Sequence, residues 1–340
     1  MCPNLSDVGL IDVHSHVVPK RFPDNPVAGA EPRWPCMRLN NATQATVMID
    51  GRPYRELDDR SWSVARRMED MDRTGVSRQV LSPMPELLSY WFKPTVGLEI
   101  CRWMNHMIGD MVASAPSRFS GLGIVPLQDP VLAAKELVAL KSDGFRGVEV
   151  GSNVNGVFLG DARFEEFLAA AAELDLAIFV HALHPIGAER LQTSPDLIPL
   201  GAFPLDTALS ALSLIRAGVP ERFPQLRFGF SHGGGAIVPL THRLAQGWRV
   251  TEGFRGSLPK VPEAYASAFF YDSLVYHPGY LAHLANEFAP NQVFCGTDYP
   301  YSIMETDPAG FIGTAAVNDD RALRHGAAQR FLGLWPKRAD

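Results

Sequence analysis

The chain has 340 residues, enough for one large hydrophobic core, and this length allows either two ordinary domains or one α/β barrel. Hydrophobic residues make up 46% and charged residues 20%, as in soluble globular enzymes. The net charge is −6, and the chain contains no block of basic residues. This charge balance argues against nucleic acid or an anionic membrane surface as the main partner.

Three further features of the sequence favour the cytoplasm. The N-terminus lacks the charged start and apolar run of a signal peptide, and no apolar run approaches the length of a membrane span. The cysteines have no CxxC spacing, so we expect reduced thiols and no disulfide framework. They are Cys2, Cys36, Cys101 and Cys295. We therefore expect a cytoplasmic protein without a membrane partner.

The first predicted element is an apolar strand at residues 9–18, followed by a long irregular stretch that reaches about residue 59. This stretch is rich in proline, glycine, asparagine and arginine. Its Asp50-Gly51 pair is typical of a turn between two short strands. So long a connection within a compact domain is usually functional. We therefore assign residues 19–61 to an insertion or lid.

Beyond this insertion, strands and amphipathic helices alternate. Several strands are apolar runs without alternation, which is typical of strands buried on both faces. The predicted strands are 9–18, 76–82, 119–126, 147–151, 176–181, 226–232, 269–273 and 293–298. The predicted helices are 62–74, 95–115, 129–141, 162–173, 205–217, 236–253, 279–288 and 319–331. This alternation predicts a (β/α)8, TIM-like barrel that forms one domain over residues 1–340, with a small insertion after the first strand.

The first strand carries two histidines, His14 and His16, separated by one residue. Side chains two residues apart on a strand point to the same face, so the imidazoles project side by side, about 6–7 Å apart at their Cα atoms. That arrangement suits two adjacent ligand positions on one divalent metal ion. The alternative is a polar His-Ser-His patch in a loop, because an isolated HxH motif has a large false-positive risk.

The active site of a (β/α)8 barrel lies at the carboxyl ends of its strands. Besides the first two histidines, the residues at these ends that suit metal or proton chemistry are His181, His232, Asp272 and Asp298. Neutral imidazoles and a carboxylate suit Zn²⁺, with Mn²⁺, Fe²⁺ or Co²⁺ as substitutes. The sequence therefore predicts a catalytic site for a divalent metal ion, with zinc as the first choice.

His232 begins the sequence Ser-His-Gly-Gly-Gly-Ala. The glycines leave the imidazole uncrowded and let a substrate approach the backbone closely, which favours a role in proton transfer or in control of a metal-bound water. The alternative is that the glycines only form a tight turn between strand and helix.

Six segments make the chain resemble the decarboxylase branch of the amidohydrolase superfamily (amidohydrolase family 2) over nearly its whole length. They are Ile11-Asp-Val-His-Ser-His16, Met71-Asp-Arg-Thr-Gly-Val76, Val125-Pro-Leu-Gln128, Val180-His181, Ser231-His-Gly-Gly-Gly235 and Gly296-Thr-Asp-Tyr-Pro300. The resemblance implies that His14, His16, His181 and Asp298 ligate the metal. It also implies that His232 is the catalytic histidine beside Asp298 and helps to deprotonate the metal-bound water.

Two arginines match the positions at which the family binds substrate carboxylates. Arg55 lies at the matching distance before Trp62, although Arg52 is close enough to take this role instead. Arg243 lies 11 residues after His232, as in the family, where it enters the site of the neighbouring subunit. Arginine suits this task because its planar fork binds a carboxylate in bidentate fashion; the alternative for each is a solvated surface charge. The resemblance thus implies a small carboxylic acid as substrate and a homodimer or larger homo-oligomer.

The chain departs from the family pattern in two places. His184 is an additional histidine near the site, a candidate for substrate contact with packing as its alternative. No tryptophan lies between His181 and Leu200, where close relatives use one to contact substrate. The fourth strand lacks the lysine that binuclear members carbamylate to bridge two metals. We therefore expect one metal ion.

The resemblance and the predicted site together imply a metal-dependent, oxygen-independent decarboxylase. Its substrate would be a carboxylated aromatic or muconate-semialdehyde-type catabolic intermediate. The alternative enzyme is a mononuclear hydrolase or hydratase of a related small carboxylic acid, which incorporates water and releases no CO2. A third class, the non-catalytic metal-binding or structural barrel, is disfavoured because a site is complete at the strand ends.

Overall fold

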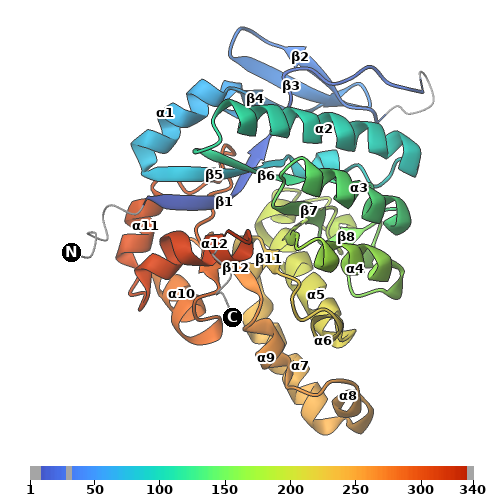
Figure 1. Cartoon of the computed structure of the whole chain (residues 1–340), viewed down its shortest axis with the longest axis vertical. Coiled ribbons are helices and arrows are strands. Elements are labelled where there is room, and N and C mark those ends of the chain that lie inside the picture. The colour runs from blue at the N-terminus through green and yellow to red at the C-terminus, as the bar shows by residue number, and fades with distance from the viewer. Residues whose placement is uncertain (1–8, 28–32, 335–340) are drawn as a thin grey trace.

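The computed structural model describes residues 9–27 and 33–334 (Figure 1). Its main sheet has eight strands in the order β1-β5-β6-β7-β10-β11-β12-β13, and neighbouring strands are parallel. They span Leu10–Val17, Val76–Pro83, Phe119–Gly123, Gly147–Gly151, Ala177–His181, Phe228–Phe230, Phe270–Asp272 and Val293–Phe294. The sheet closes because Ser15 of β1 bridges to Tyr299, and the Val13 N–H donates to the carbonyl of Cys295 at 2.9 Å. The predicted (β/α)8 barrel is confirmed.

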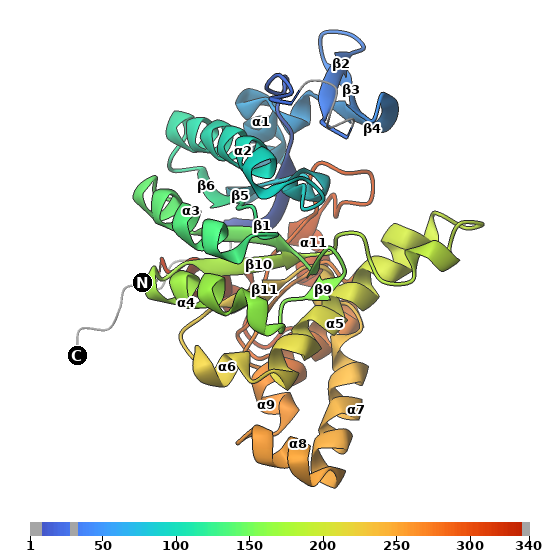
Figure 2. The same ribbon diagram turned by 90° about the vertical axis from the view of Figure 1, so that its right-hand side faces the viewer.

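Helices cover the outside of the barrel and connect its strands (Figures 1 and 2). The main ones are α1 Val64–Thr74, α2 Pro94–Ser114, α3 Pro130–Ser142, α4 Glu165–Glu173, α5 Phe203–Arg216, α7 Ile237–Val250, α10 Pro278–His283 and α12 Ala327–Phe331. The prediction for α1 is accurate because local caps define its ends. The Ser63 side chain accepts from the Arg66 N–H, and Gly75 has a left-handed backbone (φ 74°).

Several short elements were not predicted. They are the helices α6 Val219–Arg222, α8 Glu252–Ser257, α9 Pro262–Ala266 and α11 Pro308–Thr314, and the strands β8 Asn153–Val154 and β9 Val157–Phe158. None is long enough to show an apolar period. The eighth barrel strand is also shorter than the predicted 293–298. The segment after β13 still runs beside β1, as the hydrogen bond from the Asp298 N–H to the carbonyl of His14 at 2.8 Å shows.

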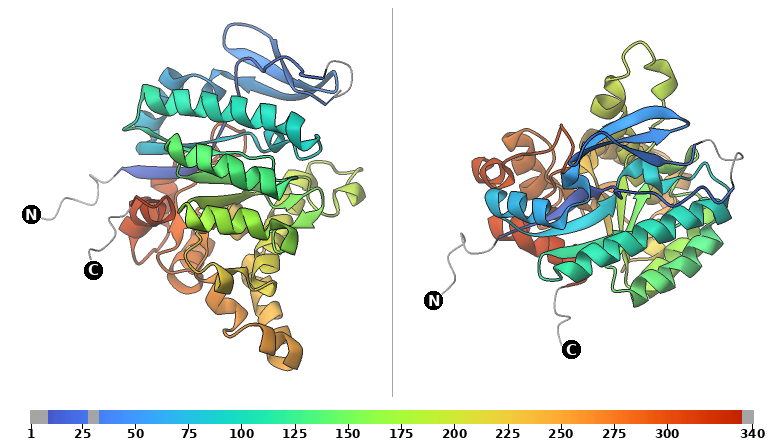
Figure 3. Two further views of the ribbon diagram at one scale, coloured as in Figure 1. Left: turned by 45° about the vertical axis from the view of Figure 1, so that its right-hand side comes forward. Right: turned by 90° about the horizontal axis from the view of Figure 1, so that it is seen from above.

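The insertion after β1 contains a small antiparallel sheet of β2 (Cys36–Leu39), β3 (Gln44–Ile49) and β4 (Arg52–Asp58). The predicted turn between two strands is confirmed at Asp50 and Gly51, which have φ values of 53° and 67°. This sheet lies at the opposite end of the molecule from α7 and α8, which project away from the barrel (Figures 1 and 3).

One helical stretch departs from the expectation that no segment matches a membrane span. Residues Ile198–Arg216, a π-helical segment followed by α5, meet that criterion by length and composition. Asp206, Thr207 and Ala208 of this stretch are nevertheless fully buried, and the Asp206 carboxylate accepts a hydrogen bond from Asn153 at 2.9 Å. We therefore assign the stretch to the wall of the barrel.

Aromatic side chains fill the barrel below the strand ends. Phe331 of α12 packs against Phe294 and Phe179, with ring centroids 5.1 Å and 6.5 Å away. Phe179 in turn contacts the imidazole of His14, with their centroids 5.2 Å apart. The first predicted metal ligand therefore rests on the rigid core of the barrel.

Candidate metal centre and active site

The structure brings the four predicted metal ligands together. His14 and His16 come from β1, His181 ends β10, and Asp298 follows β13. One ligand atom from each side chain lies within 4.8 Å of the other three. The Nε2 atoms of His14 and His16 are 3.1 Å apart, and Oδ1 of Asp298 lies 3.4 Å and 3.1 Å from them. All four residues are buried.

Each of these histidines has an acceptor oxygen at its other ring nitrogen. Nδ1 of His14 lies 2.7 Å from the carboxylate of Asp272. Nδ1 of His16 lies 2.8 Å from the carbonyl of Pro83, and Nδ1 of His181 lies 2.9 Å from that of Ala182. In the neutral imidazoles that bind metal, these acceptors fix the proton on Nδ1. The Nε2 lone pairs therefore converge on one point, as they do in protein metal sites.

Two buried atoms of this cluster test whether a cation fits. Nε2 of His181 and Oδ1 of Asp298 have no hydrogen-bond partner among the described residues. A buried polar atom without a partner costs about 1–3 kcal/mol, whereas a cation at the centre satisfies both atoms at once. Three imidazole nitrogens and one carboxylate oxygen also suit a divalent transition metal. The cluster of His14, His16, His181 and Asp298 therefore has the ligand atoms that a divalent metal ion requires.

The electrostatics of three of the ligands, His16, His181 and Asp298, favour their metal-binding protonation states. Burial lowers the pKa of His16 and holds that of His181 well below its ordinary value. Burial raises the pKa of Asp298, but the contacts with His16 and His14 outweigh this effect and leave the pKa lowered. Neutral imidazoles and an ionised carboxylate are the forms that bind metal.

Asp272 connects a metal ligand with the catalytic histidine that the sequence predicts. Its Oδ2 accepts from Nδ1 of His14 and also from the backbone N–H of His232, at 2.9 Å. Its Oδ1 accepts from the N–H of Gly233 at 2.7 Å. Burial alone would lower the pKa of His14, but the hydrogen bond with Asp272 raises it to about 9. The sequence places Asp272 at a strand end, but these contacts were not foreseen.

His232 lies next to the ligand cluster, with its ring centroid 5.0 Å from His181 and 5.4 Å from His14. Burial lowers the pKa of His232 to about 4, so its imidazole is neutral near pH 7. Its Nδ1 lies 3.0 Å from the hydroxyl of Ser231, which can donate or accept. Nε2 can therefore carry either a proton or a lone pair, as a general acid–base group requires.

The glycines after His232 fit the alternative interpretation, a tight turn. Gly233, Gly234 and Gly235 all have positive φ values, between 59° and 72°. A Cβ atom on Gly234 would lie 2.6 Å from the ring of Tyr271, and one on Gly235 would collide with the backbone of Pro204. Close packing within the protein therefore requires these glycines.

A buried polar chain below the ligands was not predicted. The side chain of Arg67 donates to the carbonyl of His16 and, at 2.6 Å, to Gln79. Gln79 donates to Asp12 at 3.0 Å, and Asp12 also accepts from the N–H and hydroxyl of Thr297, at 3.1 Å and 2.7 Å. These hydrogen bonds connect β1 to the segment that carries Asp298. Their one sequence signal is a charged Asp12 within an apolar strand.

Glu149 occupies the centre of the fourth barrel strand, which lacks the bridging lysine of binuclear enzymes. It is fully buried, and its Oε2 lies 4.0 Å from Nδ1 of His16. Burial raises the pKa of Glu149 to about 8. Within residues 9–27 and 33–334, the four-ligand cluster is the one group that could hold a metal ion.

A cavity of about 1330 Å³ opens above the cluster, and His181, His232 and Asp298 form part of its wall. The predicted residues Arg55 and His184 also line it, whereas Arg52 is exposed and lies outside the wall. Arg243 is exposed on α7 and does not line this cavity. The structure therefore brings together every predicted site residue except Arg243.

Arg55 has a defined position within this cavity. Its guanidinium lies over the ring of Tyr301, 4.4 Å from the centroid. The Tyr301 ring in turn stacks on His16, with centroids 5.1 Å apart. Tyr301 was missed in the sequence, although it directly follows the motif that contains Asp298. The stack places a cation of the insertion close to a metal ligand.

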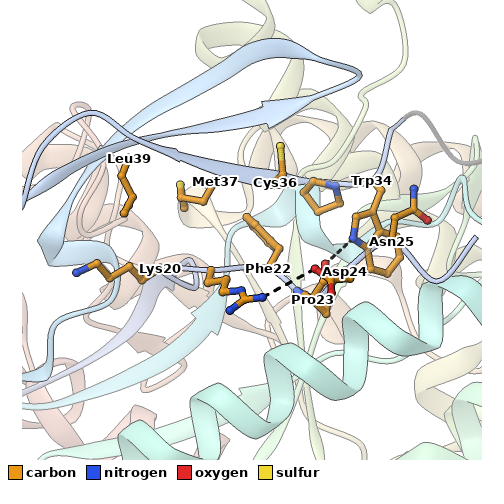
Figure 4. A pocket seen from close by; sticks show the side chains of 11 residues that line it. Lys20, Phe22, Pro23, Asp24, Asn25, Trp34, Cys36, Met37 and Leu39 are labelled. Carbon is orange, nitrogen blue, oxygen red and sulfur yellow. Dashed lines mark hydrogen bonds and ion pairs between the residues drawn. The ribbon is translucent and has the colours of Figure 1, made fainter. Parts of the chain in front are cut away.

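A second cavity, of about 670 Å³, lies between the segment Lys20–Asn25 and β2 (Figure 4). The indole N–H of Trp34 donates to the carbonyl of Pro23 at 2.9 Å, and Arg21 forms a long ion pair with Asp24. Cys36 is the exposed thiol on its edge. None of the predicted site residues lines this cavity, so we place the active site in the larger one.

Comparisons with known proteins agree with this site. The amidohydrolase family profile matches residues 11–334. The chain belongs to the amidohydrolase family. A relative, 2-amino-3-carboxymuconate-6-semialdehyde decarboxylase of Dictyostelium discoideum, is 32% identical over 335 residues, which cover 96% of this chain and 92% of the relative. The resemblance proposed from the six motifs is therefore confirmed.

Solved structures of decarboxylases share the fold of this amidohydrolase. The 5-carboxyvanillate decarboxylase of Sphingomonas paucimobilis is 25% identical with a TM-score of 0.79, and the match covers 96% of this chain and 99% of that one. A dihydroxybenzoic acid decarboxylase of Polaromonas sp. JS666 was solved with manganese and the inhibitor 2-nitroresorcinol. It is 21% identical with a TM-score of 0.76, and the match covers 96% and 97% of the two chains.

We predict that this amidohydrolase holds about one divalent metal ion per chain. His181→Ala and Asp298→Ala should each remove the metal, because a catalytic site has few ligands to spare. The measurement is metal analysis by mass spectrometry after gel filtration. His106→Ala, a change on the exposed face of α2, is the control and should keep the metal. Two tightly held metals per chain, or full occupancy in His181→Ala, would contradict the assignment.

His232→Ala should keep most of its metal and lose most of its turnover. The reason is that the His232 imidazole lies beside the ligand cluster and presents a free nitrogen for proton transfer. General acid–base groups typically contribute about 10²–10⁴-fold in rate. Metal analysis and turnover are measured on the same preparation. If His232→Ala loses metal as completely as His181→Ala, the residue is a ligand and the role assigned here is wrong.

Proposed function

We propose that the chain is a metal-dependent, oxygen-independent decarboxylase of a carboxylated aromatic acid or a muconate-semialdehyde-type intermediate. The observation that carries this proposal is the cavity, whose wall contains two metal ligands, the neutral His232 and the cation Arg55. The relatives named above, which are decarboxylases of such acids, support it.

The substrate carboxylate would be held by Arg55. This guanidinium approaches the cavity from β4 and is oriented by the ring of Tyr301. A planar guanidinium binds both oxygens of a carboxylate and so fixes the orientation of the acid toward the ligand cluster. Arg55 therefore acts through positioning, because it holds the reacting carbon of the acid next to His232 and the ligand cluster.

The proton that replaces CO2 on carbon would pass through Nε2 of His232. The imidazole is neutral, and its Nδ1 is held by Ser231, so Nε2 can take up and return one proton. A bound divalent metal ion would supply Lewis acidity, which stabilises negative charge on a substrate oxygen. Asp272 accepts hydrogen bonds from the backbone of His232 and the ring of His14. It therefore fixes the position of His232 relative to the ligand cluster.

The second candidate is a mononuclear hydrolase or hydratase of a related small carboxylic acid. The same ligand cluster and the same histidine serve that chemistry, so the products must decide between the two. We favour zinc as the metal because three imidazoles and one carboxylate suit it, with manganese, iron or cobalt as substitutes. We also favour a cytoplasmic location, because the described thiols are free.

The metal-loaded enzyme should release CO2 from at least one member of a panel of hydroxylated, aminated and muconate-type carboxylic acids. Because no electron leaves the substrate, the rate should be the same with and without oxygen. The measurement is CO2 release by membrane-inlet mass spectrometry, with product identification under argon. Arg55→Ala should raise KM for the active acid, since it removes the carboxylate anchor. Incorporation of water without CO2 release would establish the hydrolase or hydratase alternative.

The active unit should be a dimer or a multiple of one, with Arg243 acting in the site of the partner subunit. Arg243 is exposed on α7 outside the cavity of its own chain, so it needs a second copy to contact substrate. Trp248 on the same helix is half-buried, and tryptophan and arginine are enriched at interface centres.

Subunit mixing tests this shared site. An Arg243→Ala chain and a His232→Ala chain, each nearly inactive alone, are combined under conditions that exchange subunits. Hybrid dimers would contain one site with both residues intact, so part of the activity should return. Absence of recovery in purified heterodimers would show that Arg243 acts locally or has no part in catalysis.

A further inference from the structure

His184 has a backbone conformation that the surrounding structure must enforce. Its φ of 43° is left-handed, which is uncommon for a residue other than glycine. The Asn153 side chain donates to the carbonyl groups of Leu183 and His184, at 2.8 Å and 3.3 Å. The buried Asp206 accepts from Asn153 and from the N–H of Ile186, both at 2.9 Å. Strained residues fixed in this way concentrate at ligand sites.

The imidazole of His184 is fixed as firmly as its backbone. Nε2 lies 3.0 Å from the carboxylate of Glu86, and the ring stacks on Trp91 with centroids 5.1 Å apart. Glu86 also accepts from Arg33 at 3.2 Å and from the hydroxyl of Tyr54 at 3.3 Å. Burial raises the pKa of Glu86, but the contacts with His184 and Arg33 outweigh it and leave the pKa lowered, so Glu86 is ionised.

An ionised Glu86 determines which nitrogen of His184 carries the proton. A carboxylate only accepts hydrogen bonds, so Nε2 of the imidazole must donate to it. In the neutral ring Nδ1 then keeps its lone pair, and no described residue donates to it. The side chain of His184 is 49% exposed and lines the large cavity. With a neutral His184, the cavity wall therefore offers a preorganised hydrogen-bond acceptor at Nδ1.

We propose that His184 determines substrate specificity by accepting a hydrogen bond from a hydroxyl or amino group on the ring of the acid. This inference rests on the proposed function for the nature of the ligand. The cavity volume of about 1330 Å³ exceeds the 300–1,000 Å³ of common ligand sites, so it can hold a substituted ring that reaches beyond the ligand cluster. His184 selects the substituent, while Arg55 and the metal ligands hold the reacting carboxylate.

The alternative is that the contact between His184 and Glu86 only fastens the insertion to the barrel, since Arg33 and Tyr54 belong to the insertion. The two roles predict different effects of substitution. A fastening role affects all acids equally, whereas a recognition role affects only those that carry a donor. A single hydrogen bond of this kind changes affinity by about 3–10-fold.

The test is calorimetric titration of the metal-loaded protein with benzoate and with its 3- and 4-hydroxy and 3- and 4-amino derivatives. At least one donor-bearing acid should bind about 3–10-fold tighter than benzoate. His184→Leu should reduce that ratio to about one, and His184→Gln, whose amide oxygen accepts a hydrogen bond, should restore part of it. His106→Leu, the same change on an exposed helix face, should leave the ratio as in the wild type.

The proposal is overturned if no donor-bearing acid is preferred, or if His184→Leu weakens benzoate and its derivatives by the same factor. Equal metal contents of all variants exclude an effect transmitted through the ligand cluster. Because the readout is binding, it is separate from the assay of CO2 release. A protein that shows the preference but releases no CO2 would refute the proposed decarboxylase and keep the specificity role of His184.

Discussion

The structure depends on one constraint, the convergence of three imidazole lone pairs and one carboxylate oxygen in a buried place. Such a cluster is costly unless a cation occupies its centre and every other polar atom has a partner. Asp272 and the carbonyls of Pro83 and Ala182 supply those partners at the three Nδ1 atoms. Because the ligands come from β1, β10 and the segment after β13, the cluster can form only when the barrel is closed.

Asp272 links the position of His232, the proposed proton-transfer group, to that of the ligand His14. One oxygen of this carboxylate contacts both the ring of His14 and the backbone of His232, so neither can shift without the other. His232 and Asp298 also share a left-handed backbone, with φ values of 57° and 62°. Strain of this kind persists only where surrounding contacts over-determine it. The ligand cluster and His232 are therefore held in a fixed position relative to each other.

The sequence predicts features that recur at short spacing and misses those that depend on distant partners. Apolar periodicity and the glycine caps predict the barrel, and its strand ends predict where the metal site lies. The choice of His14, His16, His181 and Asp298 as ligands came from the family resemblance. The chain of Arg67, Gln79 and Asp12 could not be predicted, because its members are polar residues in separate elements with no shared spacing. His184 was noticed as an additional histidine, but its partner Glu86 is 98 residues away. Short helices such as α8 and α11 lack a period altogether.

The position of the insertion explains how one rigid scaffold can serve different acids. The barrel strands fix the ligand cluster, whereas Arg55 and Tyr54 reach the cavity from β4, and His184 reaches it from the loop after β10. Loops tolerate sequence change better than the strands they connect, because their side chains are not part of the packed core. Under the proposed function, a change of substrate would alter side chains on β4 and on the loop after β10 and retain the four ligands and His232. The architecture thus separates the ligand cluster at the strand ends from the cavity residues on β4 and on the loop after β10.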